Sequence, residues 1–249
     1  MKRLLLTLAL CTPALHAAPL PAPIKALQDQ GLTFHGEFDA PAGLKGYAAQ
    51  YQQQGVAVYL TADGKNTLVG NLYDAQGKDL SAEPLDRLVF AEMDKANWQR
   101  LENSTWIADG KADAPRIVYV FSDPNCPYCT MFWNQARPWV DAGKVQLRHI
   151  MVGIIRADSA AKAAAMLTSK DPAAALQQHE KAGKQSTLTG LDKIPANVED
   201  QLAANLDLMT DLGTPATPAI FYHNDKGRVQ QQQGAPRMDL LESILGKHP

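Results

Sequence analysis

The run from Ile117 to Cys129, IVYVFSDPNCPYC, constrains the fold of this chain more than any other segment. Five β-prone residues lead into a Ser-Asp-Pro-Asn turn, which is followed directly by cysteine and proline. Such apolar runs favour strands, whereas proline and asparagine favour turns. Proline is well tolerated at the first position of a helix, where its missing N–H needs no partner. The segment therefore predicts a strand, a tight turn and a helix, with Cys126 at the N-cap and Pro127 at the first helical position.

A cysteine at a helix N-cap has unusual chemistry. Its sulfur faces unpaired backbone N–H groups and the positive end of the helix dipole, and both favour the thiolate over the thiol. We expect the pKa of Cys126 to fall from about 8.5 into the range of about 3.5 to 7.5 that reactive cysteines show. Cys129 lies one helical turn later on the same face, where it can form a disulfide with Cys126. The pair is predicted to be a redox-active dithiol.

Two other roles for a C-x-x-C pair fit this sequence less well. A zinc site requires four ligands, but there is no second C-x-x-C, and His149, His179 and His223 are scattered without ligand spacing. A structural disulfide across so short a loop restricts the unfolded chain least and therefore stabilises least. The motif and its strand-turn-helix context favour redox catalysis, and no metal or cofactor is expected.

Length and composition narrow the class of protein. A chain of 249 residues is long enough for two modest domains. Its net charge is −2 and it has no polybasic run, so nothing favours nucleic acid or a charged membrane surface as a partner. With 45% hydrophobic and 20% charged residues, the composition is that of an ordinary globular protein rather than a disordered or fibrous one.

The first residues resemble an export signal. Two basic residues precede a short apolar core, and Ala17 and Ala18 offer small residues for cleavage. Residues 1–17 are therefore predicted to be a secretory signal peptide. A lipoprotein signal that uses Cys11 is the alternative, but Leu10 is bulkier than such a site requires. Cleavage would remove Cys11 and leave only the C-x-x-C pair, as in a protein that works in an oxidising compartment without structural disulfides.

Residues 18–79 are predicted to form a small N-terminal α+β domain. An amphipathic helix that ends at Gly31 is followed by four strand-like runs, at residues 32–38, 46–51, 56–61 and 67–73. The breaks between the runs are polar or glycine-containing, and the last break has the pattern of a hairpin. So few elements make a thin core that usually needs a partner for stability. We therefore expect this domain to form a homodimer.

Residues 80–105 are predicted to form a linker helix. The segment is rich in charge and helix formers, its apolar positions are sparse, and Pro84 is expected to break it early. A helix that is polar on most sides often bridges domains. The alternative is that it packs as an ordinary outer helix of the second domain.

Residues 106–249 are predicted to form the catalytic domain. The helix after Cys129 contains Pro138, which is expected to kink it near Asn134, and the strand at 145–152 completes a βαβ unit. Three alanine-rich stretches, 159–169, 172–182 and 197–212, form a helical insertion. Pro218 is expected to begin a strand because it cannot donate to a ladder. The closing helix at 236–245 is expected to turn four apolar residues inward: Met238, Leu241, Ile244 and Leu245.

This order of elements resembles that of the thioredoxin superfamily. The C-P-Y-C motif followed downstream by Thr-Pro is specific to that superfamily. The added N-terminal domain and linker resemble the DsbC/DsbG family of V-shaped, dimeric thiol:disulfide interchange proteins of the periplasm. The LPAP of residues 20–23, the WQR of residues 98–100 and the C-P-Y-C itself match the DsbG members best. The implied fold is mixed α+β and α/β: a thioredoxin-like catalytic domain with a helical insertion, joined by a linker helix to an α+β dimerisation domain.

The resemblance also implies roles for individual residues. Cys126 corresponds to the exposed nucleophile and Cys129 to the resolving thiol. Thr217 precedes Pro218, whose peptide bond is cis in this superfamily and abuts the disulfide, with the neighbouring backbone pairing with extended substrate. Pro127 and Tyr128, between the cysteines, are implied to tune the redox potential and to contact substrate.

The implied activity is reduction or isomerisation of disulfides in exported proteins, or reduction of the sulfenic acid of a lone cysteine. The resemblance names the inner-membrane reductase DsbD as electron donor, a homodimer as the assembly and the periplasm as the compartment. The dimer is implied to shield the active sites from the oxidase DsbB. Two alternatives remain open from the sequence: a DsbA-like oxidant, and a chaperone-like dimer whose cleft binds unfolded chains with the dithiol secondary.

Overall fold

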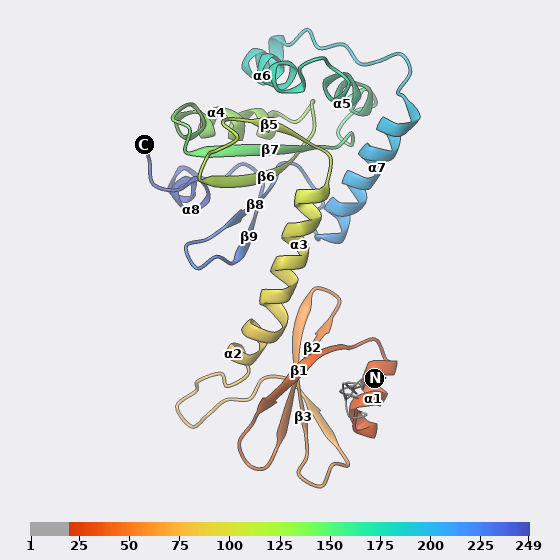
Figure 1. Cartoon of the computed structure of the whole chain (residues 1–249), viewed down its shortest axis with the longest axis vertical. Helices are drawn as coiled ribbons and strands as arrows, with labels where there is room; N and C mark the ends of the chain where they lie inside the picture. The colour runs from red at the N-terminus through yellow and green to blue at the C-terminus, as the bar shows by residue number, and fades with distance from the viewer. Residues whose placement is uncertain (1–19) are drawn as a thin grey trace, which may run out of the picture. The chain divides into compact units, whose positions relative to one another are not determined.

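The computed structural model describes residues 20–249, so the predicted signal peptide and Cys11 lie outside the described residues (Figure 1). The chain divides into two compact units, of which the first ends at Phe90 and the second begins at Ala91. No helix in the described part of the chain is both long and apolar enough to cross a membrane.

The first unit is a helix and a four-stranded antiparallel sheet. Helix α1 is followed by four strands that pair in sequence order, β1-β2-β3-β4. Their bounds are α1 Ala22–Asp29, β1 Thr33–Asp39, β2 Lys45–Tyr51, β3 Gln54–Leu60 and β4 Thr67–Val69. The predicted fourth strand at 67–73 is too long, because the chain leaves the sheet after Val69 and Gly70 has a φ of +142° that does not continue a strand.

The core of this unit lies between α1 and one face of the sheet. Alternate residues of a strand point to opposite faces, so Tyr47 and Ala49 of β2 share a face with Val58 and Leu60 of β3. Ile24 of α1 is fully buried against them. The core is small, as the sequence predicts for so short a unit.

The predicted linker segment at 80–105 is helical, and the boundary between the two units falls within it. Helix α2 (Ala82–Leu85) and a π-helical turn, η1 (Asp86–Phe90), belong to the first unit, and the next helix is α3 (Ala91–Asn103). The expected break at Pro84 is wrong, because Pro84 is the third residue of α2, where a backbone N–H has no partner within the helix.

Helix α3 belongs to the second unit and packs on it. Leu101 is fully buried, and the ring of Trp98 stands edge-on to Tyr119 with 5.0 Å between ring centroids. This part of the segment therefore packs as an outer helix of the second unit, which was the alternative interpretation. A helix that is polar on most sides needs only a narrow apolar stripe to dock in this way.

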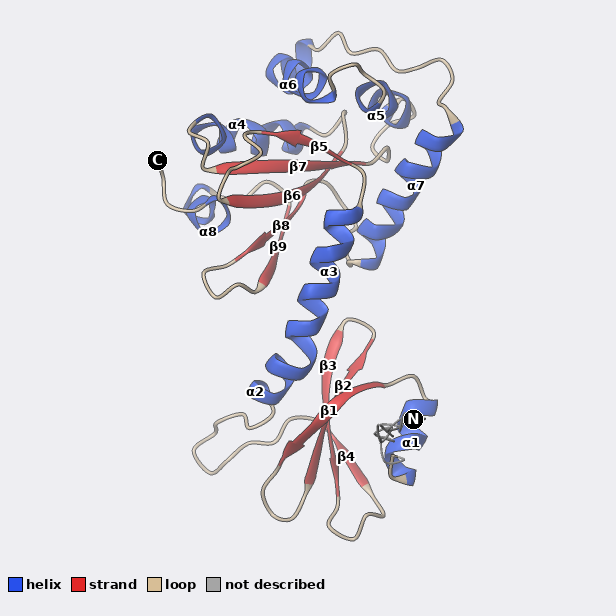
Figure 2. Cartoon of the chain, in the orientation of Figure 1, coloured by secondary structure: helices blue, strands red, loops and turns tan. Residues whose placement is uncertain are grey.

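The second unit is built on a five-stranded sheet with the order β5-β7-β6-β8-β9 (Figure 2). Its strands are β5 Trp106–Asp109, β6 Arg116–Ser122, β7 Val145–Met151, β8 Ala219–His223 and β9 Val229–Gln233. β6 and β7 are parallel and are joined through helix α4 (Pro127–Asp141), so the predicted βαβ unit is confirmed. The other neighbours pair antiparallel.

Helices cover both faces of this sheet. Val118 and Val120 of β6 pack in a cluster with α4 and α8 (Leu241–Leu245), whereas Tyr119 and Phe121 pack in another with α3 and α7 (Ala196–Asp211). Helices α5 (Ser159–Leu167) and α6 (Pro172–Ala182) form a further apolar cluster with part of α7. The predicted helical insertion at 159–212 is therefore present, and α6 of this insertion packs against α4.

The predicted closing helix at 236–245 is too long. The segment consists of a 3-10 turn, η3 (Met238–Leu240), followed by the short helix α8. Leu241, Ile244 and Leu245 are buried as predicted, but Met238 is 71% exposed. Because the α-helix begins only at Leu241, its 3.6-residue period does not extend back to Met238.

Candidate redox site

Cys126 is the N-cap residue of α4, where the sequence places it. Its backbone is extended, with φ −87° and ψ 109°, and Pro127 is the first residue of the helix. The Cys126 Sγ accepts a hydrogen bond from the backbone N–H of Cys129 at 3.3 Å. The sulfur therefore replaces one of the missing backbone acceptors at the helix start, as the side-chain oxygen of a capping serine does.

The two cysteines are free thiols, and their environments differ. The expectation of an exposed Cys126 is wrong, because its sulfur contacts Thr217 and Cys129 and the residue is only 4% exposed. Cys129 is 2% exposed. A hydrogen bond from the Cys129 thiol, with support from the backbone N–H groups of Cys129 and Tyr128, lowers the pKa of Cys126 to about 6 against the effect of burial. Burial, together with the adjacent Cys126 sulfur, raises the pKa of Cys129 well above its usual value. Cys126 therefore ionises first, while Cys129 keeps its proton.

The segment at Thr217 and Pro218 lies beside the dithiol although it is 91 residues away in sequence. The Cys126 thiol donates to the carbonyl oxygen of Thr217 at 3.3 Å. The Thr217–Pro218 peptide bond is cis, and both residues are buried. The Thr217 hydroxyl is also buried, and its interaction with the Cys126 sulfur helps to lower the pKa of Cys126.

Pro127 and Tyr128 are exposed beside the dithiol, and Tyr128 is 58% exposed. The other aromatic residues of α4 behave differently, because Phe132, Trp133 and Trp139 are all buried. The first turn of α4 therefore presents its outer side to solvent while the rest of the helix packs on the sheet.

Asp123 anchors the loop that holds Cys126, and sequence reasoning assigned it no role beyond a turn. Its carboxylate is 1% exposed and accepts four hydrogen bonds. They come from the backbone N–H of Asn125 at 2.8 Å, the N–H of Ile154 at 2.7 Å, the N–H of Ile155 at 3.0 Å and the hydroxyl of Ser159 at 2.8 Å. An aspartate before Pro-Asn is a signal for a local turn, but nothing in the sequence points to its partners some thirty residues later.

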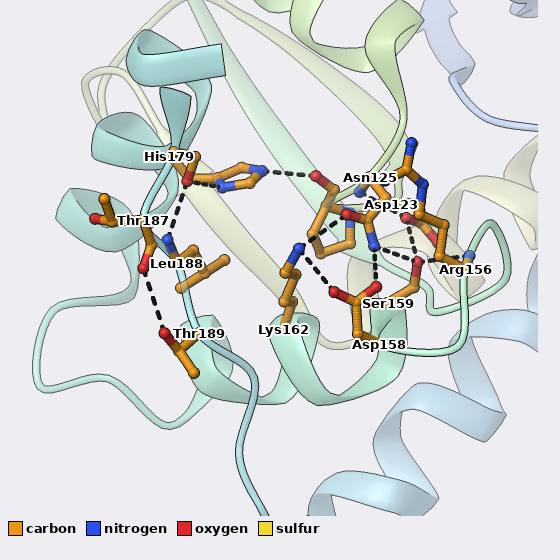
Figure 3. A network of polar contacts seen from close by, with 12 residues as sticks. Asp123, Asn125, Arg156, Asp158, Ser159, Lys162, His179, Thr187, Leu188 and Thr189 are labelled. Atoms are coloured by element: carbon orange, nitrogen blue, oxygen red, sulfur yellow. Dashed lines mark hydrogen bonds and ion pairs between the residues drawn. The ribbon is translucent and has the colours of Figure 1, made fainter. Parts of the chain in front are cut away.

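His179 connects the helical insertion to the same loop (Figure 3), and Glu180 connects it to helix α4. His179 Nε2 lies 2.7 Å from the carbonyl oxygen of Pro124, and its Nδ1 lies 2.6 Å from the hydroxyl of Ser186. The hydroxyl of Thr130 donates to the buried carboxylate of Glu180 at 2.7 Å. Because a carbonyl can only accept, Nε2 carries a proton, and in the neutral ring Nδ1 accepts from Ser186. Sequence reasoning considered His179 only as a metal ligand, and its helical context carried no other signal.

Metal-ligand geometry is not found around these groups. In the part of the chain that the structure describes, no three His, Cys, Asp or Glu side chains are gathered so that they hold a metal ion. The arrangement instead offers one acidic thiol at the N-terminal end of a helix, a second thiol one turn later, and a carbonyl oxygen that accepts from the first.

Comparison with known proteins places this geometry in a family. Residues 107–249 match the model of a thioredoxin-like domain, and residues 14–82 match that of a disulfide bond isomerase protein N-terminal domain. The thiol:disulfide interchange protein DsbG of Pseudomonas aeruginosa is 67% identical over 233 residues, which cover 94% of this chain and 91% of that protein. This chain belongs to the DsbC/DsbG family. A second member, DsbG of Escherichia coli, is 48% identical and covers 99% of each chain.

Solved structures agree on the fold of the second unit. A periplasmic thioredoxin-like protein from Salmonella enterica serovar Typhimurium superposes with a TM-score of 0.51 at 21% identity, covering 60% of this chain and 94% of that one. The predicted fold, a thioredoxin-like domain with an N-terminal domain of the DsbC type, is confirmed. As a member of the DsbC/DsbG family, the chain is a thiol:disulfide oxidoreductase that reduces or isomerises disulfides.

Proposed function

We propose that Cys126 is the nucleophile and Cys129 the resolving thiol of this oxidoreductase. The observation that supports the assignment is the opposite shift of the two pKa values, with Cys126 lowered to about 6 and Cys129 raised. The Cys126 thiolate attacks one sulfur of a client disulfide, so that the client S–S bond breaks and the other client sulfur leaves as a thiolate. Cys129 then loses its proton and attacks Cys126, which releases the reduced client and leaves a Cys126–Cys129 disulfide.

Thr217, Pro218, Pro127 and Tyr128 are proposed to bind the client. Thr217 contacts the Cys126 sulfur, and Tyr128 exposes its ring beside it. Because the carbonyl of Pro218 accepts from the N–H of Gly234 at 2.8 Å, the backbone on the Thr217 side is the part that is left to pair with an extended client. The backbone at Thr217 would therefore bind the main chain of the client on one side of the dithiol, and Pro127 and Tyr128 would contact its side chains on the other.

The same dithiol chemistry extends to a sulfenic acid. Attack of the Cys126 thiolate on the sulfur of a client Cys–SOH forms the same kind of mixed disulfide, and the hydroxyl leaves as hydroxide, which is protonated to water. Cys129 resolves the adduct as before. Each reduction of a client disulfide or sulfenic acid oxidises the dithiol by two electrons, so a reductant must restore it, whereas isomerisation returns the dithiol unchanged. We propose the periplasm as the compartment and the inner-membrane dithiol reductase DsbD as the donor, on the family resemblance and the export signal expected in residues 1–17.

Trapping in the exporting cell tests this function. With Cys129→Ala, Cys126 still attacks but the adduct is not resolved, so clients should accumulate as mixed disulfides that a reducing agent releases. Clients with a single cysteine indicate sulfenic acid reduction, whereas clients with several indicate disulfide reduction or isomerisation. The Cys126→Ser, Cys129→Ala double variant is the control and should capture nothing. Equal capture by the double variant, or none by Cys129→Ala, contradicts the proposal.

We further propose that two chains pair through the edge of the first unit's sheet. β4 has a neighbour on one side only, and an unpaired strand edge is a template for pairing with another chain. Leu68 and Val69 of this strand are 56% and 57% exposed, and Tyr73 just beyond it is 58% exposed. Contiguous apolar side chains along a free edge favour burial against a second copy in a two-fold arrangement.

Substitution at this edge should separate the two chains. The Leu68→Asp, Val69→Asp double variant puts carboxylates opposite their symmetry mates, so sedimentation at micromolar concentration should show a monomer where the wild type shows a dimer. Leu206→Asp, which changes an apolar residue that is 37% exposed on α7, is the matched control and should remain a dimer. A monomeric wild type, or a double variant that stays dimeric, rules out this interface.

A further inference from the structure

A cavity of about 540 Å³ opens directly beside Cys126. Its walls come from the loop before α4 and the first turn of that helix, from the loop and helix that follow β7, and from the end of α6. Cys126 and Pro127 form one side, and three cationic residues, Arg156, Lys162 and Lys184, contribute to the others. No Asp or Glu is among the described residues that line it.

The positive charge of this cavity is only partly balanced. Lys162 Nζ lies 2.9 Å from Asp158 Oδ2 and 3.0 Å from Asn125 Oδ1, so its charge has a local partner (Figure 3). Arg156 and Lys184 have no carboxylate partner among residues 20–249, and both are exposed. Two cationic side chains therefore face a concave surface without an internal counter-ion.

The acidic groups nearest to the cavity do not supply that counter-ion. Asp123 lies in the loop behind Cys126, where four hydrogen bonds already occupy its carboxylate. Glu180 is 3% exposed and accepts from Thr130. His179 also lines the cavity, but both ring nitrogens are held by Pro124 and Ser186, so it forms a fixed wall and is not free to bind an anion.

The first turn of α4 separates this cavity from an apolar surface. Pro127 and Thr130 are three residues apart, share a helix face and line the cavity. Tyr128 and Met131, also three apart, are shifted by one residue to the neighbouring face and are 58% and 48% exposed. A client segment that crosses Cys126 therefore meets apolar side chains on one side of the helix and unpaired cations on the other.

We propose that this cavity binds an acidic side chain of the client, close to the oxidised cysteine that Cys126 attacks. The inference rests on the function proposed above and adds a preference among clients: a carboxylate of Asp or Glu on one side of the cysteine. Arg156 offers a planar fork that matches a carboxylate, and Lys184, from another segment of the wall, offers a second charge. The contact acts on client binding and leaves the sulfur chemistry itself unchanged.

Model peptides test the preference. Each peptide carries one cysteine as a mixed disulfide with 2-thiopyridine and is flanked by Asp and Glu, by Asn and Gln, or by Lys. Reduced protein in excess attacks the peptide sulfur, the S–S bond breaks and released thiopyridone is followed by absorbance in a single turnover. We expect the acidic peptide to react about 5-fold faster than the neutral one, as two partly exposed ion pairs permit. Raising the salt from about 0.01 M to about 1 M should remove the difference.

Variants connect the preference to the cavity. Arg156→Gln with Lys184→Gln should bring the acidic peptide down to the neutral rate, and Arg156→Glu with Lys184→Glu should favour the lysine peptide. Lys226→Gln, an exposed lysine in the turn between β8 and β9, is the matched control and should keep the preference. Equal rates of wild type on all peptides, or an acidic preference that survives charge reversal, overturns the inference. If the wild-type protein does not react with the neutral peptide either, that result contradicts the proposed function and not the preference for acidic clients.

Discussion

Replacing Cys126 by serine is expected to reduce the rate of client reduction to that of the reaction without protein. A serine hydroxyl at the same N-cap does not ionise near neutral pH, and a thiolate is the attacking species in disulfide exchange. Cys129 cannot take over, because burial raises its pKa and leaves it protonated near neutral pH. Single-turnover release of thiopyridone from a neutral peptide measures the loss. Cys129→Ala is the control and should keep the first step while losing release of the client.

The pH dependence of the same first step reports on the thiolate. Because the pKa of Cys126 is lowered to about 6, the wild-type rate should rise as pH increases through about 6 and then level off. Below that pH the thiol form donates to the Thr217 carbonyl and is unreactive. A rate that rises only near the ordinary cysteine pKa of about 8.5 would show that the helix start does not stabilise the thiolate.

Removing Arg137 is expected to destabilise the second unit by about 3–5 kcal/mol, because it leaves a buried carboxylate without its cation. Asp109, at the end of β5, is fully buried. Arg137 Nη1 donates to Asp109 Oδ1 at 3.2 Å, and Nη2 is paired with Oδ2. Burial raises the pKa of Asp109, but the His149 ring, whose Nε2 lies 3.8 Å from the carboxylate, and the Arg137 guanidinium outweigh this effect and hold that pKa well below its usual range. Chemical denaturation of Arg137→Ala at neutral pH measures the cost.

Two further variants separate this effect from simple loss of a side chain. Arg100→Ala removes an ion pair with Asp211 whose side chains are 41% and 59% exposed, and should cost about 1 kcal/mol or less. Asp109→Asn combined with Arg137→Met leaves no unpaired charge and should be more stable than Arg137→Ala alone. If Arg137→Ala costs no more than Arg100→Ala, the buried carboxylate is not what makes Arg137 important.

Most elements of the fold follow from local sequence pattern. The strand, turn and helix around Cys126 were predictable because proline, asparagine and a β-prone run each favour one conformation through short-range sterics. The misplaced features share a cause, since Pro84, residues 70–73 and Met238 lie at the ends of elements. An end depends on caps and tertiary contacts that the periodicity of apolar residues does not describe.

The dithiol and its place at a helix start are determined by the sequence alone, because both depend on residues adjacent in the chain. Only the tertiary structure brings Thr217 to Cys126, places Asp123 against Ser159, ties His179 to the catalytic loop and gathers Arg156 with Lys184 around one cavity. Those contacts join segments some thirty to ninety residues apart in the sequence. Which of these distant groups meet depends on how the helical insertion and the sheet pack together. The chemistry is thus encoded locally, whereas the surroundings that tune it and select clients are encoded by packing.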